Sequence, residues 1–446
     1  MSSAAEQLAA NFNWSTFSKA DDLKKRLWFT LAALLVFRLG AYLPLPGIDA
    51  ELMQAISQRN SGGVLGLLDK FSGGALGNMA IFALGVMPYI SASIIVQLMT
   101  AVVPQLESLK KEGESGRKKL NQYTRYGTVL LALVQSFGIT VGLESMQGSP
   151  VIDPGFLFRV SSVLSLTGGT LFLMWLGEQI TSRGVGNGIS LIIFAGIVSG
   201  MPGALGQLFD LGRTGQISAF LIFMIMLVIA ATLIFIVYVE RAQRRVHITY
   251  PKRVVGNRQY GGDNTHMPLK LNTAGVIPPI FASAMLMIPQ TIAGFSTNVD
   301  PDSLLASFLV HMGYGRPLYL LLFVAMIVFF AFFYTSVVFN PTEKAEDLKK
   351  AGAIVPGYRP GEHTATYLDY ILTRLTVVGA IYLAVICAFP IVLMNNYAIP
   401  LYLGGTSLLI VVSVAIDTVT QIQSHLISHQ YQGLTGRTRP KKGKRR

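Results

Sequence analysis

Residues 217–239 read ISAFLIFMIMLVIAATLIFIVYV and contain no charged side chain. The hydrocarbon core of a bilayer is about 30 Å thick, and about 20 apolar helical residues are enough to cross it. This stretch is therefore long enough to span a membrane. Because backbone amides and carbonyls in lipid must be satisfied internally, the stretch is predicted to be an α-helix.

Nine further apolar runs of similar length lie before and after this one. Charged residues make up only 13% of the chain and hydrophobic residues 51%, whereas soluble domains carry about 25% charged residues. The predicted fold class is therefore an all-α polytopic membrane protein with ten transmembrane helices. The helices are expected near 27–46, 79–101, 126–144, 156–177, 189–206, 217–239, 273–294, 317–339, 372–394 and 398–420.

Basic residues lie mostly on one side of these predicted helices. The N-terminal segment, the even-numbered loops and the C-terminal tail hold most of the 36 lysines and arginines, and the formal net charge is +13. The positive-inside rule then predicts that both termini are cytoplasmic. Such basic loops either reflect topology alone or bind anionic lipid, RNA or acidic proteins.

Ten helices with both termini on one side divide naturally after the fifth. Because five is odd, the two halves would have opposite orientations, as in inverted-repeat transporters. The halves share no convincing sequence identity, so the repeat rests on topology alone. The expected parts are a cytoplasmic segment (1–26), an N-terminal half (27–206), a hinge loop (207–216), a C-terminal half (217–420) with long cytoplasmic loops at 240–272 and 340–371, and a basic cytoplasmic tail (421–446).

The segment 63–78, GVLGLLDKFSGGALGN, is apolar but too short to span a membrane. Asp69 and Lys70 lie in its middle, and three glycines loosen its end. Irregular backbone at membrane depth survives only where protein or a water-filled cavity surrounds it. The segment is either a short movable half-helix that folds into a cavity or an ordinary external loop, and the residues alone favour neither.

Two pairs of β-branched residues share a helix face. Val86 and Ile90 are four residues apart, as are Ile189 and Ile193. Stiff branched side chains could form a narrow apolar constriction that resists ions by dewetting. Spacing alone, however, favours ordinary packed or lipid-facing surface.

A few polar residues interrupt the predicted helices. Such groups are costly in lipid and tend to face protein or water. Arg38 lies in the middle of the first run and is predicted to pair with backbone or an acidic group, whereas Asn187 and Asn340 lie near helix ends and suit helix caps. Gln97 and Asn272 are the other polar residues of this kind in or next to the predicted helices.

The signals for enzymatic or cofactor chemistry are weak. GVGNG at 184–188 follows no strand and is better explained as a tight turn between two helices. His425 and His429 lack a third metal ligand, and no nucleophile, base or carboxylate set points to hydrolysis. We therefore expect no catalytic residue, no metal and no cofactor.

Ten strings along the chain resemble the bacterial SecY family of protein-conducting channels. They follow the family's order and spacing over nearly the whole sequence. The strings are PLPGID (44–49), FSGGAL (71–76), MPYISASII (87–95), KEGESG (111–116), QYTRYG (122–127), FLMWLGEQIT (172–181), GNGIS (186–190), AGVIP (274–278), VPGYRPG (355–361) and GGTSLLI (404–410).

The resemblance implies two five-helix halves around an hourglass pore that a plug closes. The plug falls on about 63–77, and its residues include Leu65, Leu67, Leu68, Phe71, Gly73 and Gly74. The family's pore ring falls on Val86, Ile90, Ile189, Ile193, Ile280 and Ile410. Val86 departs from the isoleucine often found there, but it remains branched and apolar.

The family also has a lateral gate and a cytoplasmic docking surface. The gate lies between the second and third helices on one side and the seventh and eighth on the other, which implies gate positions at Ser91, Gln97, Asn272 and Ile288. The docking positions implied for the SecA motor or the ribosome are Arg244, Arg245, Arg258 and Arg359. Asn257 stands where some relatives have a second arginine, so the contact there is expected to be weaker.

The function implied by the resemblance is passive transport of unfolded polypeptides through a bacterial inner membrane, and of their membrane segments sideways into lipid. The implied partners are SecE, SecG, the SecA ATPase, the ribosome with its anionic RNA, polypeptides with signal peptides, and membrane lipid. The main alternative is a small-solute transporter, which is also built from inverted repeats. That alternative needs a polar site at mid-membrane, where this sequence has mainly Ile, Val and Met.

Overall fold

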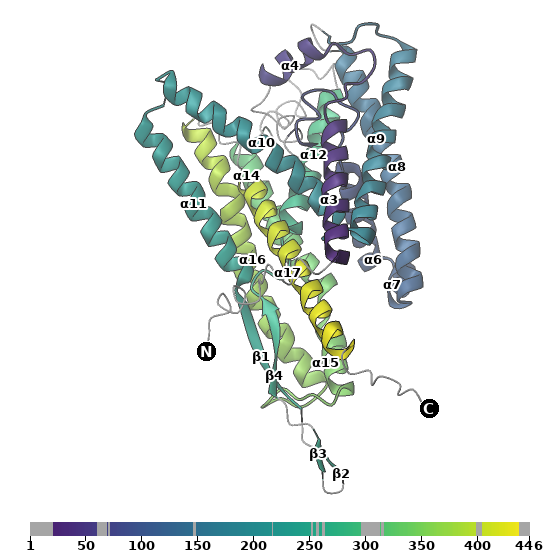
Figure 1. The fold of residues 1–446 in the computed structure, drawn as a ribbon, viewed down its shortest axis with the longest axis vertical. Helices are drawn as coiled ribbons and strands as arrows, with labels where there is room; N and C mark the ends of the chain where they lie inside the picture. Colours follow the sequence, from purple (N-terminus) through teal and green to yellow (C-terminus); the bar gives the residue numbers. More distant parts are fainter. Residues whose placement is uncertain are drawn as a thin grey trace, which may run out of the picture.

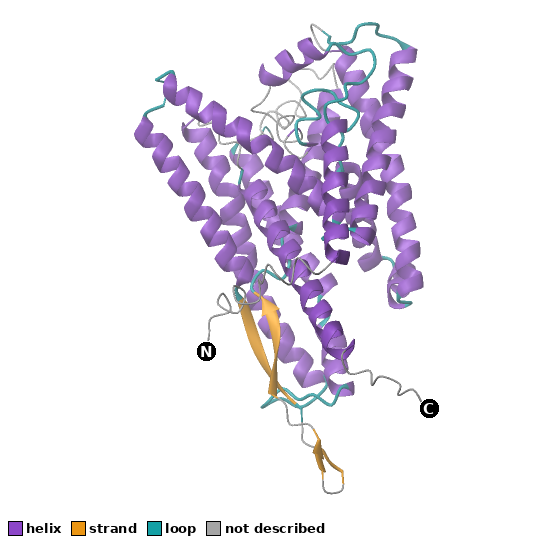
Figure 2. Cartoon of the chain, in the orientation of Figure 1, coloured by secondary structure: helices purple, strands orange, loops and turns teal. Residues whose placement is uncertain are grey.

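The computed structural model describes residues 21–59, 69, 72–145, 149–215, 217–250, 253–255, 258–260, 264–295, 313, 316–397 and 404–436. Long helices run side by side through most of the molecule, and a small group of strands extends from one end (Figures 1 and 2). In the described part, seven helices are long and apolar enough to cross a membrane. The helical membrane fold predicted from the sequence is confirmed.

Each of the ten predicted runs contains a helix. The helices are α3 (Asp21–Gly40), α6 (Met87–Val102), α8 (Glu114–Ser145), α9 (Phe156–Arg183), α10 (Gly188–Arg213), α11 (Ala219–Arg241), α12 (Ile277–Phe295), α14 (Pro317–Val338), α16 (Glu362–Tyr397) and α17 (Gly405–Gly436). Three shorter helices are α4 (Ala50–Arg59), α7 (Pro104–Lys111) and α15 (Pro341–Lys350). Over their described residues, which for α12 are Ile277–Leu286, the helices α3, α6 and α12 do not reach the length or hydropathy of the other seven as single helices, although α6 does so together with α7, from which it is bent by 99°.

The second predicted helix begins later than the sequence suggests. Residues 81–86 form turns, and α6 starts only at Met87 rather than near residue 79. Gly85 has φ +56°, a left-handed conformation that interrupts a helix, and Pro88 occupies the first turn of α6, where proline is well tolerated. The apolar run therefore divides into a buried turn region and a shorter helix.

Helix α10 is longer than predicted. It continues through Pro202 to Arg213, so the first part of the expected hinge at 207–216 is helical. The direct connection to α11 is correspondingly short.

The long loop at 240–272 forms antiparallel strands rather than irregular chain. Strand β1 (Gln243–Thr249) pairs along its whole length with β4 (Asn264–Lys270), and β2 (Arg253–Val255) pairs with β3 (Arg258–Tyr260). Val246 and Leu269 are buried against Val355 on the second long loop. Among the described residues, the paired strands all belong to this loop.

The elements are distributed between two ends of the molecule. The hairpins, α15 and the C-terminal end of α17 lie at one end, whereas α4 and the turn from α10 to α11 lie at the other (Figure 1). In the same view α8 and α9 lie at one side and α11 at the other, with α10 and α17 between them. Helix α10 contacts both α9 and α17, which places it at the centre of the bundle.

Glycines allow helices to approach very closely on both sides of the centre. A Cβ atom on Gly188, at the start of α10, would lie 1.9 Å from the carbonyl oxygen of Gly177 on α9. A Cβ atom on Gly405, at the start of α17, would lie 1.8 Å from the carbonyl oxygen of Ile386 on α16. Small residues at membrane helix contacts allow this approach, and here they set the positions of α10 and α17.

Candidate functional site

The six branched residues expected to line a pore all belong to the large apolar core that runs through the helix bundle. Val86, Ile90, Ile193 and Ile410 are buried, and Ile189 and Ile280 are half-buried and pack against the same cluster. They come from four elements, namely α6 with the turn before it, α10, α12 and α17. We call these six residues the ring cluster.

The start of α10 is held in place by a cap and a close contact. The side chain of Asn187 accepts hydrogen bonds from the backbone N–H groups of Ile189 and Ser190, at 3.2 Å and 3.3 Å. The expected cap is thereby confirmed, as is the cap of α15 by Asn340. The tight turn predicted at 184–188 is confirmed as well, because α9 ends at Arg183 and α10 begins at Gly188.

The described part of the segment 63–78 is folded into the protein. Residues 72, 73 and 75–77 are buried, although external loops are usually exposed. The backbone carbonyl of Asp69 accepts from the N–H of Gly74 at 2.9 Å, and the Asp69 carboxylate accepts from the N–H of Gly77 at 2.6 Å. The end of the segment is thus a compact turn. Leu65, Leu67, Leu68 and Phe71 lie outside the described residues.

Arg38 joins this turn to α3 and α10. Its guanidinium donates one hydrogen bond to the backbone carbonyl of Gly73 and another to Ser199 Oγ, the second at 3.0 Å. The predicted pairing of Arg38 with backbone is confirmed. Its predicted place in the middle of a helix is wrong, because α3 ends at Gly40 and Arg38 lies in its last turn.

The helices expected to form a lateral gate are in contact. Helix α12 contacts both α6 and α8. Ser91 is buried on α6, and Gln97, also on α6, donates to Ser93 Oγ on its own helix at 3.3 Å. Ile288 belongs to α12, but its side chain lies outside the described set.

Asn272 is hydrogen-bonded to α11. It precedes α12 and is almost fully buried, and its amide donates to the Glu240 carboxylate of α11 at 2.7 Å and to the Gly275 carbonyl at 3.0 Å. These bonds join the two ends of the strand-bearing loop.

The basic residues expected to dock a partner lie on two joined loops. Arg244 and Arg245 are exposed on β1, and Arg359 is exposed in the turn before α16. Arg258 lies on β3, and its side chain is outside the described set. Thr249 of β1 and Ile354 exchange two backbone hydrogen bonds of 2.9 Å, which join the strand hairpin to the loop that carries Arg359.

Comparison with known proteins identifies the family. A family model described as SecY matches residues 80–419. A protein translocase subunit SecY from Rickettsia typhi is 52% identical over 423 residues, which cover 94% of this chain and 97% of that protein. The chain belongs to the SecY family.

Solved structures share the SecY fold at low identity. One, which concerns the plug domain of the SecY protein and the membrane seal of the closed translocation channel, has a TM-score of 0.62 at 17% identity. Another is Sec61 in the canine ribosome-channel complex, with a TM-score of 0.60 at 15% identity. Each match covers 91% of this chain and 93% of the solved chain.

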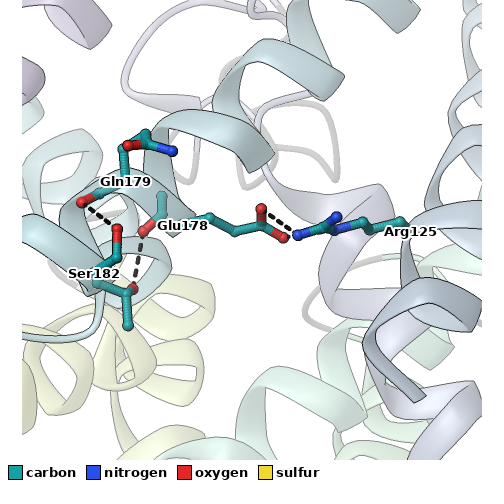
Figure 3. A network of polar contacts seen from close by, with 6 residues as sticks. Arg125, Glu178, Gln179 and Ser182 are labelled. Atoms are coloured by element: carbon teal, nitrogen blue, oxygen red, sulfur yellow. Dashed lines mark hydrogen bonds and ion pairs between the residues drawn. The ribbon is translucent and has the colours of Figure 1, made fainter. Parts of the chain in front are cut away.

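Two of the strings that resemble the SecY family meet in an ion pair. Arg125, from QYTRYG on α8, donates to both carboxylate oxygens of Glu178, from FLMWLGEQIT on α9, at 2.9 Å and 2.7 Å (Figure 3). Two parallel bonds of this kind fix orientation as well as distance. The pair therefore braces α8 against α9.

Sequence reasoning missed this pair and did not identify Gly73 as the backbone partner of Arg38. Both contacts were signalled by charged residues, with Arg38 inside an apolar run and Arg125 and Glu178 at the edges of two others, because a charge there is costly without a partner. The sequence did not indicate which residue would be the partner, because Arg38 and Gly73 are 35 positions apart and Arg125 and Glu178 are 53 apart.

Proposed function

We propose that this SecY-family chain is the central subunit of a protein-conducting channel. It moves unfolded secretory polypeptides across a membrane and releases their apolar segments sideways into lipid. The observation that carries this proposal is that six branched apolar side chains from four separate elements all belong to one apolar core inside the bundle. Such a cluster offers a translocating chain no polar group on which to stop.

The ring cluster acts as a deformable gasket. Short branched side chains can yield around the different side chains of a passing polypeptide. They provide no hydrogen bond or charge that would trap it, and an apolar constriction resists ions by dewetting. Val86, Ile90, Ile189, Ile193, Ile280 and Ile410 are the proposed ring.

Residues 63–77 act as the plug beneath this ring. Support comes from the burial of residues 72, 73 and 75–77 and from the compact turn at their end. When a polypeptide enters, the plug moves aside. When the channel is idle, the plug and the ring together block ions.

The lateral gate opens between α6 and α8 on one side and α12 and α14 on the other. The contact of α12 with α6 and α8 supports this location. Ser91, Gln97 and Ile288 lie on gate helices, whereas Asn272 contributes by holding the start of α12 against α11.

The exposed arginines of the two joined loops bind the partner that supplies the energy for polypeptide transport. That partner is the SecA ATPase or the translating ribosome, and the chain itself is a passive pore without cofactor or catalytic residue. Arg244, Arg245, Arg258 and Arg359 make the contacts, the ribosomal ones in part with anionic RNA. A Sec61 relative of the same fold occurs in a ribosome-channel complex, which supports this assignment. SecE and SecG are the companion subunits.

The chain resides in the bacterial inner membrane with both termini in the cytoplasm. The unequal distribution of basic residues supports this orientation. Residues 27–206 and 217–420 form the two halves, joined by the hinge at 207–216, and the basic tail at 421–446 stays in the cytoplasm.

Reconstitution in proteoliposomes distinguishes this function from small-solute transport. We expect the purified channel, with its companion subunits, motor ATPase and ATP, to carry an unfolded signal-bearing polypeptide to a protease-protected interior. Saturable uptake of a small solute, without protection of the polypeptide, would favour the transporter instead.

A further inference from the structure

We propose that Arg38 is the positioning residue that latches the plug in the closed channel. This inference rests on the proposed function, because it assigns a role to a residue that contacts the end of the plug. The latch consists of Arg38 on α3, the Gly73 carbonyl at the end of the plug, and Ser199 with Gly196 on α10.

The latch joins three separate parts of the chain through one guanidinium nitrogen. Arg38 Nη1 donates to the Gly73 carbonyl and to Ser199 Oγ, and Ser199 Oγ in turn donates to the Gly196 carbonyl at 2.7 Å. The second nitrogen, Nη2, donates to the Tyr42 hydroxyl, and the guanidinium lies 4.6 Å from the centre of the Tyr42 ring. Tyr42 thus contacts the guanidinium with both its hydroxyl and its ring, while Nη1 is directed at the plug and at α10.

Both backbone conformation and packing favour glycine at position 73. Its φ is +71°, a conformation that other residues rarely adopt, and a Cβ atom there would lie 2.9 Å from Gly196 Cα. The plug backbone therefore packs directly on the backbone of α10. Gly74 has a similar φ of +84°, but a Cβ atom there would meet nothing within 4 Å.

The Gly73 carbonyl can accept a hydrogen bond from Arg38 because the backbone N–H groups of the turn donate to other oxygens. The hydrogen bonds within the turn use the carbonyl and carboxylate of Asp69, the hydroxyl of Ser72 and the carbonyl of Gly74. Among the hydrogen bonds described for this turn, the Gly73 carbonyl accepts only from Arg38 of α3. A charged donor makes a stronger hydrogen bond to this carbonyl than a neutral donor does.

The contacts of Arg38 suit a closure that can be reversed. Among the described residues, Arg38 makes no ion pair, and its hydrogen bonds go to neutral oxygens. When the plug leaves, the guanidinium loses one acceptor and needs water or another oxygen in its place. Plug release and solvation of Arg38 are therefore coupled, as expected for a reversible closure.

The first test is the ion conductance of the idle channel in planar bilayers, recorded for Arg38→Met and Arg38→Lys. We expect Arg38→Met to raise the open fraction about tenfold, because a hydrogen bond made by a charged group is lost. Arg38→Lys keeps a charged donor and should restore most of the seal. Arg213→Met is the matched control, since Arg213 is exposed at the C-terminal end of α10 and contacts no described plug residue.

A second pair of variants tests the packing of the plug on α10. Gly73→Ala and Gly74→Ala impose similar backbone strain, but only Gly73→Ala also collides with Gly196. We expect Gly73→Ala to leak several times more than Gly74→Ala, and equal leakage would overturn the claim that this contact holds the plug closed.

The outcomes distinguish the latch from the channel function itself. If the unsubstituted protein transports polypeptide and is sealed, and Arg38→Met is equally sealed, the latch proposal is overturned and the channel function stands. If Arg38→Lys leaks as much as Arg38→Met, a charged donor is not what holds the plug, and the proposal is likewise rejected. If the unsubstituted protein transports no polypeptide, the proposed function has failed first.

Discussion

Replacing Gly188 with alanine tests how the ring cluster is positioned. The new Cβ atom would lie 1.9 Å from the carbonyl oxygen of Gly177 and 2.7 Å from its carbonyl carbon. An ordinary contact needs about 3.5 Å, so the start of α10 must move about 1.5 Å away from α9. Both close atoms belong to backbone, and no flexible side chain can yield.

This displacement acts directly on the ring. Ile189 and Ile193 lie on the first turns of α10, so they move with it. Overpacking of this kind costs about 1–3 kcal/mol, and interiors at crystal-like density tolerate it poorly. We therefore expect Gly188→Ala to lower the melting temperature in detergent and to increase the ion conductance of the idle channel severalfold.

Gly200→Ala is the matched control for this substitution. Gly200 lies on the same helix, and a Cβ atom there would meet nothing within 4 Å. It should leave both the conductance and the melting temperature unchanged. A Gly188→Ala protein that is as stable and as tight as the Gly200→Ala protein would refute the reasoning that the contact with α9 positions the ring.

Four further predictions follow from other contacts. Asn187→Ala removes the cap of α10 and should cost about 1 kcal/mol of unfolding free energy, measured by thermal or denaturant unfolding in detergent. A double-mutant cycle with Arg125→Gln and Glu178→Gln should give a coupling of about 1 kcal/mol, because the pair is bidentate but half-exposed, and a coupling of zero would show that it does not brace the helices. Ile193→Asp should raise the idle conductance about tenfold, since a charge wets an apolar constriction, and an unchanged conductance would place the seal elsewhere. Arg359→Glu should abolish most motor-driven transport into proteoliposomes at normal protein levels, and undiminished transport would remove Arg359 from the docking surface.

The helices of the membrane part could be predicted largely from the sequence. Long apolar runs without charges have one structural solution in lipid, and α11 and α14 therefore lie close to the predicted runs. The caps at Asn187 and Asn340 could be predicted because an asparagine at the edge of an apolar run satisfies free N–H groups in its own neighbourhood.

Other features depend on conformation or on distant contacts. The late start of α6 is caused by the left-handed backbone at Gly85, which hydropathy does not reveal. The pairing of β1 with β4 arises in a polar loop without clear alternation, so the sequence did not predict those strands. The grouping of the ring cluster from four elements is a matter of tertiary packing, and only the resemblance to a family pointed to it.

Photocrosslinking of a stalled secretory polypeptide tests the central claim most directly. A photoreactive residue is introduced at each ring position in turn, including Ile410, which is 1% exposed, or at Leu227, which is 51% exposed on α11. If polypeptides pass through the ring, the stalled chain will crosslink to position 410 and not to position 227. A stalled chain that is protected from protease inside the vesicle, yet crosslinks to neither position 410 nor any other ring residue, would contradict the account.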